Sequence, residues 1–199
     1  MPRIEQPGLT YHVTAHGLGG IPLYRTPDDR AVALELLIDE IGRSAWTCVE
    51  YCFMSTHYHV VLELQKPTLS SGFHRFNGRY ARYFNRTYGR RGHAFEERFH
   101  ARSVETDLHR LEVARYVALN PAKARMCDRP EEYPWSGYGS IIGLQPADPA
   151  IDIRAALTPF GGSREAYRAF VEEADPRERR CLASDRHPAT DGARPGARR

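Results

Sequence analysis

Residues 54–65 read MSTHYHVVLELQ, a run in which two histidines stand one residue apart at the start of an apolar segment. Side chains alternate between the two faces of a β-strand, so in a strand over 57–64 His57 and His59 share one face, with Cα atoms roughly 6.5–7 Å apart. Such a strand is anchored to a core by its other face and presents two imidazoles side by side. The residues expected on the buried face are Tyr58, Val60, Leu62 and Leu64.

The sequence on either side of this strand follows two patterns. β-Branched and aromatic residues predict strands, and apolar residues at helical spacing predict helices. Only Ser55 and Thr56 separate two of the strands, which we therefore expect to form a hairpin. Gly42 is expected to end the first helix, and Asn120 with Pro121 the third. The expected elements are a strand over 9–16, a helix over 31–41, strands over 45–54 and 57–64, a helix over 69–88, a strand over 99–104 and a helix over 107–119.

The order β-α-β-β-α-β, followed by a helix, is typical of the ferredoxin-like split βαβ arrangement. We expect an α+β fold with an antiparallel sheet that is covered by helices on one face and has its other face available. The main domain is expected over residues 1–143. An extension over 144–175 contains a short helix at 164–173, and residues 176–199, which lack any periodicity, are expected to be a disordered tail.

The composition indicates a chain with a hydrophobic core. Of its 199 residues 41% are hydrophobic, and the formal net charge is +3. There is no stretch of about 18 apolar residues that would span a membrane, and no basic start followed by an apolar core that would mark a signal peptide. None of the four cysteines forms a C-x-x-C pair. We expect a cytoplasmic protein with no membrane partner and with reduced thiols, in which Cys48 and Cys52 pack as small apolar residues.

A His-x-His pair alone is weak evidence for a metal site, because histidine has many structural roles. The best further partner lies in VARYVALNPAK, where Tyr116 and Asn120 are four residues apart and share one helix face. Tyr116 offers a hydroxyl group, and Asn120 offers a carbonyl oxygen, a hard ligand that suits Mg²⁺ or Mn²⁺. A purely structural reading stays open here, with the histidines as a surface pair, Tyr116 as half-buried core and Asn120 as a helix cap.

A basic segment follows the hairpin. Between residues 74 and 102 eight arginines stand against only two acidic residues. The first four follow at spacings of four, three and four and form one stripe on a helix, which matches a phosphate backbone, and the aromatic rings between them can stack on unpaired bases. A solvated helix face is the alternative, but acidic partners at i±4 are missing, so we favour nucleic acid and expect a nucleoid-associated protein. The candidate DNA-binding residues are Arg75, Arg79, Arg82, Arg86, Arg90, Arg91 and Arg98, and the interleaved aromatic residues are Phe76, Tyr80, Tyr83 and Phe84.

Several linked motifs occur in one order: YHVTAHG at 11–17, MSTHYH at 54–59, GRRGHAFEERFHAR at 89–102, and RYVALNPAKA at 115–124 followed by EEYPWSGY at 131–138. With these motifs the chain, from about Tyr11 to Gly143, resembles the single-tyrosine HUH transposases of the IS200/IS605 type, and most closely the REP-associated tyrosine transposases. There are two departures. Ser55-Thr56 stands where the family usually has Pro-Asn, and His16 stands where it often has an arginine, which bears on DNA contacts.

The resemblance implies a role for each candidate residue. Tyr116 would be the nucleophile, and His57, His59 and Asn120 would hold a divalent cation, Mg²⁺ or Mn²⁺. The implied reaction is metal-dependent cleavage and rejoining of hairpin-bearing single-stranded DNA, either REP-like or from the end of a mobile element, through a 5′-phosphotyrosine. IS200/IS605 enzymes resemble dimers that share active sites, and REP-associated relatives are expected to act as monomers, so we leave open a monomer or a homodimer.

Two alternatives stand beside this reading. The first keeps the fold without the reaction, as a DNA- or RNA-binding module that no longer cuts, although the presence of all four candidate active-site residues argues against it. The second is a His-x-His metallohydrolase, which needs carboxylate ligands near His57 and His59. Glu63 shares their strand face but lies too far along the strand, and such an enzyme has no use for the arginine stripe.

Overall fold

Four strands pair into one antiparallel sheet in the computed structural model, which describes residues 5–173. The strands are β1 (Thr10–His16), β2 (Trp46–Phe53), β3 (His57–Leu64) and β4 (His100–Val104). Their order across the sheet is β2-β3-β1-β4. Because β3 is antiparallel to both of its neighbours, β1 and β2 run parallel to each other with β3 between them. This is the split βαβ arrangement, and the predicted fold class is confirmed.

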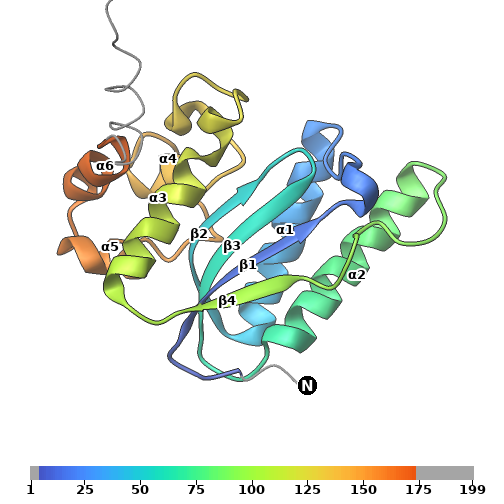
Figure 1. Ribbon diagram of the computed structural model, residues 1–199, viewed down its shortest axis with the longest axis horizontal. Coiled ribbons are helices and arrows are strands. Elements are labelled where there is room, and N and C mark those ends of the chain that lie inside the picture. Colours follow the sequence, from blue (N-terminus) through green and yellow to red (C-terminus); the bar gives the residue numbers. More distant parts are fainter. Residues whose placement is uncertain (1–4, 174–199) are drawn as a thin grey trace, which may run out of the picture.

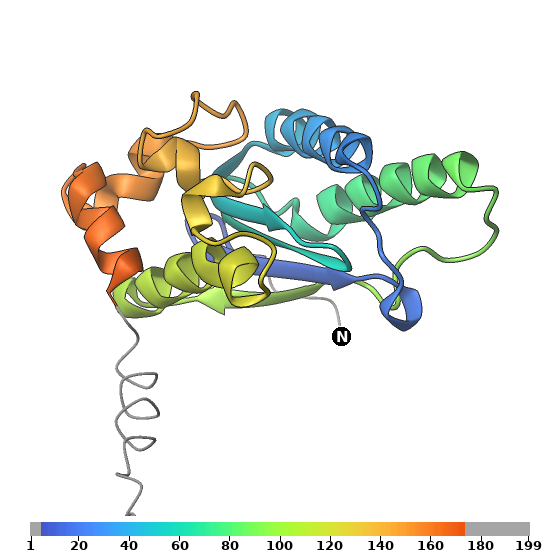
Figure 2. The same cartoon turned by 90° about the horizontal axis from the view of Figure 1, so that it is seen from above.

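Helices lie on both faces of the sheet. α1 (Pro27–Ser44) and α2 (Leu69–Thr87) pack side by side on one face, and α3 (Asp107–Lys123) lies against the other (Figure 1; Figure 2). We expected the second face to be available, and α3 covers part of it. The reason lies in β2 and β3, whose residues are almost all buried, including Val49 and Val61, so that both faces of these strands need cover.

The first helix ends later than predicted. A capping box between Thr26 and Asp29 starts α1, as the threonine and the early acidic residues indicate. The helix passes Gly42 and ends at Ser44, because Ala45 adopts the left-handed conformation, with φ 53°. A glycine inside the last turn therefore did not act as the terminator.

α3 also extends beyond its predicted end. It runs through Asn120 and Pro121 to Lys123. Pro121 has no N–H to donate, but the turn after it is held by hydrogen bonds from Ala124 N–H to the Asn120 carbonyl and from Met126 N–H to the Pro121 carbonyl, each 2.9 Å long. Asn120 consequently lies within the helix, and its side chain is free to project from the helix surface.

The aromatic residues of α2 form the core between the sheet and the two helices on that face. Tyr58 of β3 packs against Phe73 and Phe76 of α2. Tyr80 is fully buried and donates a hydrogen bond to the Leu23 carbonyl at 2.6 Å. Amphipathic packing of this helix therefore places its rings inward and its polar residues outward.

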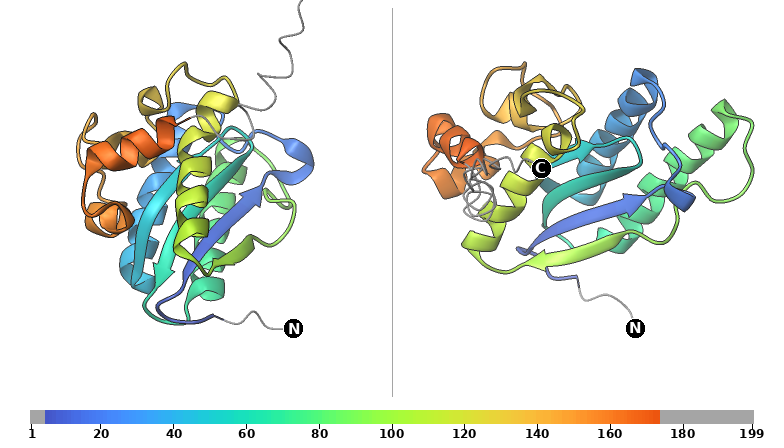
Figure 3. Two further views of the ribbon diagram at one scale, coloured as in Figure 1. Left: turned by 60° about the vertical axis from the view of Figure 1, so that its left-hand side comes forward. Right: turned by 45° about the horizontal axis from the view of Figure 1, so that its top comes forward.

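The chain after residue 143 packs against β2 and α3 (Figure 3). Tyr51 of β2 donates a hydrogen bond to Asp148 at 2.5 Å, and Tyr167 donates one to Glu50 of β2 at 2.8 Å. The domain boundary at 143 stays a prediction, and the predicted tail at 176–199 lies outside the described residues. The helices of this part are α5 (Ile153–Leu157), η3 (Thr158–Phe160) and α6 (Arg164–Glu172), the last at the position predicted for a short helix. The other short helices are η1 (Leu18–Gly20), η2 (Pro130–Glu132) and α4 (Tyr138–Ile141).

The described cysteines carry free thiols. Cys48 and Cys52 are buried, as predicted, and Cys127 is half-buried. Cys181 lies outside the described residues. Within residues 5–173 none of the helices combines the length and the apolar character needed to cross a membrane.

Candidate active site

His57 and His59 lie on the face of β3 that is turned towards α3. Their rings are perpendicular, with centroids 4.9 Å apart. His59 is buried, with 4% of its surface exposed, and His57 is half-buried. The predicted pair therefore shares one face, as alternate positions on a strand require.

Two further histidines reach this pair from β1, and the motifs alone did not place them there. In the antiparallel register His16 lies opposite His57, and the two rings stack with centroids 4.7 Å apart. His12 Nε2 lies 3.0 Å from His59 Nδ1, and these two rings stack at 5.2 Å. The signal in the sequence is that His12 and His16 of YHVTAH are an even number of positions apart, so they share one face of a strand. Only the pairing of β1 with β3 shows that they share the face of the His-x-His pair.

α3 supplies the other two predicted residues. Asn120 Nδ2 lies 3.0 Å from His59 Nε2, so the amide donates a hydrogen bond to the ring. The Tyr116 ring is perpendicular to that of His59, with centroids 5.3 Å apart, and Tyr116 is 48% exposed. The alternative of a core tyrosine and a capping asparagine is therefore wrong, because Tyr116 is open to solvent and Asn120 contacts His59 from inside a continuing helix.

Burial keeps three of the histidines neutral. Loss of solvation, helped by His16, lowers the pKa of His57 to about 4. Loss of solvation also lowers the pKa of His12 to about 4, and, with the neighbouring histidines, that of His59 to about 2. Neutral imidazole keeps a free lone pair and is the form that binds metal ions.

The residue types of His57, His59 and Asn120 would suit a divalent cation, with the protein supplying only part of its ligands. Asn120 presents its amide nitrogen to His59, and rotation of the amide presents its oxygen instead. Two imidazoles and one amide oxygen leave the remaining positions around an ion to phosphate oxygens and water. Within residues 5–173 no group of three His, Cys, Asp or Glu side chains is arranged to hold a metal ion. These residues would therefore leave an ion open to a phosphate group, unlike the closed ligand set of a structural metal site.

Two arginines of the predicted stripe are engaged within the protein. Arg75 pairs with the buried carboxylate of Glu40 on α1 at 2.6 Å. Arg79 pairs with Asp39, also on α1. Acidic partners are missing along α2 itself, as the sequence indicated, but α1 supplies them across the interface between the two helices. Spacing within a single helix cannot reveal such partners.

Arg82 and Arg86 form the exposed part of the stripe, and neither pairs with an acidic side chain in the part of the chain that the structure describes. The aromatic residues between the arginines already make contacts within the protein. Tyr83 donates a hydrogen bond to Asp29 at 3.0 Å. The prediction of base stacking is wrong for the three rings that are buried in the core, Phe76, Tyr80 and Phe84.

The stripe and the histidines lie on opposite faces of the sheet. Tyr58 packs against α2, whereas His59, its neighbour along the strand, packs against Tyr116 of α3, and His57 shares the face of His59. The two helices lie on opposite faces of the sheet (Figure 2). The helical arginines are therefore not part of the site around Tyr116. A DNA that touches both must pass around an edge or an end of the sheet.

The loop between α2 and β4, which carries other predicted arginines, passes beside the end of β1. Glu96 N–H donates a hydrogen bond to the His16 carbonyl at 2.9 Å, and Leu18 N–H donates one to the Ala94 carbonyl at 3.0 Å. The backbone of this loop is thus tied beside the histidine end of the sheet. The predicted DNA-binding residues that it carries are Arg90, which is half-buried, and Arg91 and Arg98, which are exposed.

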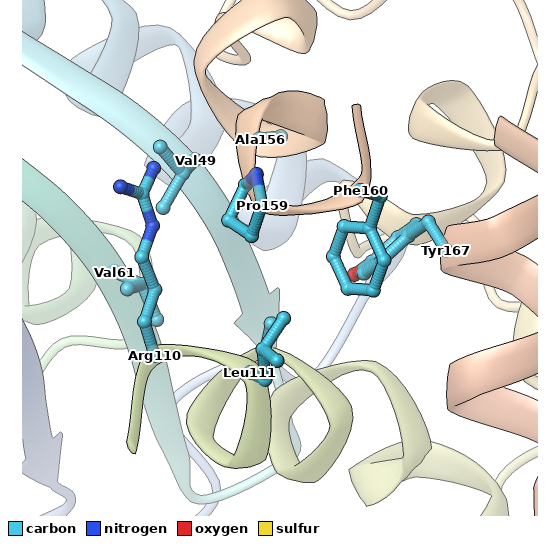
Figure 4. Close-up of a pocket in the computed structure, with 9 residues that line it drawn as sticks. Val49, Val61, Arg110, Leu111, Ala156, Pro159, Phe160 and Tyr167 are labelled. Atoms are coloured by element: carbon cyan, nitrogen blue, oxygen red, sulfur yellow. The ribbon is translucent and has the colours of Figure 1, made fainter. Parts of the chain in front are cut away.

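The contact between α3 and the sheet is tight. A cavity of about 10 Å³ lies between Leu111 on α3, Val61 on the sheet and Tyr167 on α6 (Figure 4). Such a volume holds about one water molecule at most, so little empty space is left at this point of the contact. A wider groove of about 470 Å³ runs along β2 between Trp46 and residues 149–154, and none of the predicted site residues lines it.

The fold and the site together define a class of protein. A ferredoxin-like sheet carries a His-x-His pair on a central strand, and one helix presents a tyrosine and an amide to that pair. These residues belong to the motifs that resemble the single-tyrosine HUH transposases.

Comparison with known proteins gives the family. The family model described as "Transposase IS200 like" matches residues 24–120, a segment that contains all four predicted active-site residues. This segment belongs to the IS200-like transposases, and the predicted family is confirmed. A solved structure of a REP-associated tyrosine transposase bound to a REP hairpin has a TM-score of 0.56 and 16% identity to this chain, and the likeness covers 74% of this chain and 88% of that one. At this identity the likeness shows the shared fold. No curated protein matches the chain.

Proposed function

We propose that this chain is a metal-dependent tyrosine transposase that cleaves and rejoins hairpin-bearing single-stranded DNA. The observation that carries the proposal is the convergence of α3 on β3, in which Asn120 contacts His59 at 3.0 Å and Tyr116 faces the same ring. Membership of the IS200-like transposases supports the class of reaction. The related fold that was solved with a REP hairpin supports a hairpin as the substrate.

Each site residue has a task in this reaction. The Tyr116 hydroxyl gives up its proton to solvent as its oxygen attacks the scissile phosphorus. A bond from the tyrosine oxygen to phosphorus forms, the bond to the 3′-oxygen breaks, and the 3′-oxygen takes up a proton from solvent and leaves as a hydroxyl. A tyrosine hydroxyl has a pKa near 10 and is a weak nucleophile unless the charge that develops on the phosphate is stabilised. Mg²⁺ or Mn²⁺ held by His57, His59 and Asn120 would supply that stabilisation. Because the phosphotyrosine keeps the energy of the phosphodiester bond, a 3′-hydroxyl can reverse the step and join strands.

The exposure of Tyr116 suits this task. Half of its surface is open, so a DNA strand can reach the hydroxyl without movement of α3. His59 is buried and fixed by contacts on both of its nitrogens. Tyr116 and the histidines belong to the same chain, so one protomer contains a full set of site residues. Whether the protein acts as a monomer or a homodimer stays a prediction.

Covalent capture tests the proposal. Wild-type protein is incubated with Mn²⁺ and a hairpin-bearing single strand that carries a label at its 5′ or its 3′ end. Because tyrosine attack expels the 3′-hydroxyl, we expect only the fragment on the 3′ side of the break to become attached to protein. Tyr116→Phe removes one oxygen from a half-exposed side chain, so melting temperature and hairpin affinity should be unchanged while the adduct is lost.

Matched variants separate the assignments. Tyr83→Phe removes a hydroxyl on the opposite face of the sheet and should keep the adduct. His57→Ala with His59→Ala should bind the hairpin and form no adduct, and a chelator should abolish the wild-type adduct. If Tyr116→Phe still forms an adduct, the nucleophile is misassigned. A wild-type protein that binds the hairpin and never forms an adduct would support the non-cutting binding module.

A further inference from the structure

His12 lies outside the segment that matches the family model, yet it contacts the most buried histidine of the site. Its Nε2 atom is 3.0 Å from His59 Nδ1, and the two rings are nearly parallel, with an interplanar angle of 23°. His12 is half-buried and is held in the sheet by the pairing of β1 with both β3 and β4. The contact therefore has a defined position on a rigid element.

The protons in this chain of contacts can be assigned. The amide nitrogen of Asn120 is a donor only, so His59 Nε2 must accept from it and carry the lone pair. A neutral His59 then has its proton on Nδ1 and donates it to His12 Nε2. His12 must in turn carry its own proton on Nδ1. One direction of donation thus runs from Asn120 through His59 to His12.

We propose that His12 is a positioning residue, which accepts the Nδ1 proton of His59 and so holds His59 in the tautomer whose Nε2 lone pair faces α3. The inference rests on the proposed function, in which that lone pair serves a divalent cation. Histidines that bind metal ions depend on a partner at their other nitrogen, which fixes the tautomer and the ring orientation.

The second histidine of the motif has a comparable partner. His57 Nδ1 lies 3.2 Å from the hydroxyl of Thr56. Both histidines therefore have an anchored Nδ1, one through a strand neighbour and one through the residue before it. Because these contacts engage both Nδ1 atoms, the Nε2 atoms of His57 and His59 are the ones whose lone pairs would serve a metal ion.

Two substitutions of His12 isolate the hydrogen bond from the packing. His12→Phe keeps a planar ring beside His59 and removes the acceptor. His12→Gln places an amide oxygen near the position of Nε2 and restores the acceptor. The first readout is the tautomer of His59, measured by ¹⁵N NMR on the metal-free full-length protein. We expect an Nδ1 proton in the wild type and in His12→Gln, and a shift towards the Nε2 proton in His12→Phe.

The second readout is Mn²⁺ affinity, measured by titration calorimetry. Loss of a partner of this kind typically weakens metal binding about 10–100-fold, so we expect a loss of this size in His12→Phe and near wild-type affinity in His12→Gln. An Nε2 proton on His59 in the wild type overturns the inference without any variant. An unchanged tautomer in His12→Phe also overturns it. The covalent adduct of the wild type tests the proposed function separately, because the tautomer measurement needs neither metal nor DNA.

Discussion

Glu50 is a carboxyl group whose behaviour is set by its surroundings. It is buried in β2, at a bulge where the pairing with β3 shifts between Cys48 and Glu50. It accepts hydrogen bonds from Tyr51 N–H at 3.0 Å and from the Tyr167 hydroxyl at 2.8 Å. Burial nevertheless raises the pKa of Glu50 to about 8, so the folded protein keeps this carboxyl protonated at neutral pH. Glu50 thus joins β2 to α6 as an uncharged group.

The raised pKa predicts how stability depends on pH. An unfolded glutamate ionises near pH 4.5, whereas Glu50 in the folded protein ionises near pH 8. The folded state binds more protons between these values, so the stability that this group contributes is complete below the lower value and is lost as pH rises to the upper one. The free energy of unfolding should fall by up to about 1.4 kcal/mol per pH unit on account of this group.

Glu50→Gln tests this dependence, because the amide keeps the shape of the protonated carboxyl and does not titrate. Urea unfolding across the same pH window should show a shallower fall of the unfolding free energy in the variant than in the wild type. Equal slopes would show that Glu50 does not titrate as described.

At the scale of elements, the basic and aromatic residues of α2 have three different roles. Its rings fill the core, as Tyr80 does. Two of its arginines, Arg75 and Arg79, pair with acidic residues of α1. Only Arg82 and Arg86 face solvent without an acidic partner among the described residues. A contribution of this helix to DNA binding therefore rests on the last two turns.

We expect Arg82→Ala with Arg86→Ala to weaken binding of a hairpin-bearing single strand and to flatten its salt dependence. Each lost phosphate contact reduces the slope of log affinity against log salt by about 0.7 for a single strand. Fluorescence anisotropy at several salt concentrations measures this slope. Arg154→Ala removes an exposed arginine from α5, far from α2 in Figure 1, and should leave the slope unchanged. An unchanged slope in the double variant would place the DNA path at the loop after α2 instead.

At the scale of the whole molecule, the chain after residue 143 holds the helix that carries Tyr116. Arg115 donates a hydrogen bond to the Phe170 carbonyl at 2.9 Å, and its guanidinium lies 3.7 Å from the centre of the Phe170 ring. Arg110 donates one to the Ala155 carbonyl at 2.8 Å. α3 is thus fixed between the sheet and α5 with α6 (Figure 3).

Arg115→Ala should loosen α3 and lower the free energy of unfolding by about 2 kcal/mol, since it removes a charged hydrogen bond and a cation–π contact. We expect faster hydrogen exchange in α3 and slower adduct formation at Tyr116, with β3 and α2 protected as in the wild type. Glu112→Ala, at an exposed position of the same helix, is the matched control and should change neither. If exchange in α3 is the same in both variants, the C-terminal segment does not position Tyr116.

Local spacing was enough to predict the order of the elements and the fold class, and it singled out four candidate site residues, whose roles came from the family resemblance. Strand alternation placed His57 and His59 on one face, and helical spacing placed Tyr116 and Asn120 on another. Both periods follow from the geometry of a single element and can be read from a short stretch of sequence. The order of elements then indicated the split βαβ sheet, and the family motifs brought the two pairs together.

Contacts between elements determined the features of the fold and of the site that local spacing did not predict. His12 meets His59 across 47 residues of sequence, through the register of β1 on β3. Arg75 finds its acidic partner on α1, and α3 continues through the buried Pro121. Such contacts depend on the register and docking of two elements at once, and the local spacing within either element carries no information about its partner.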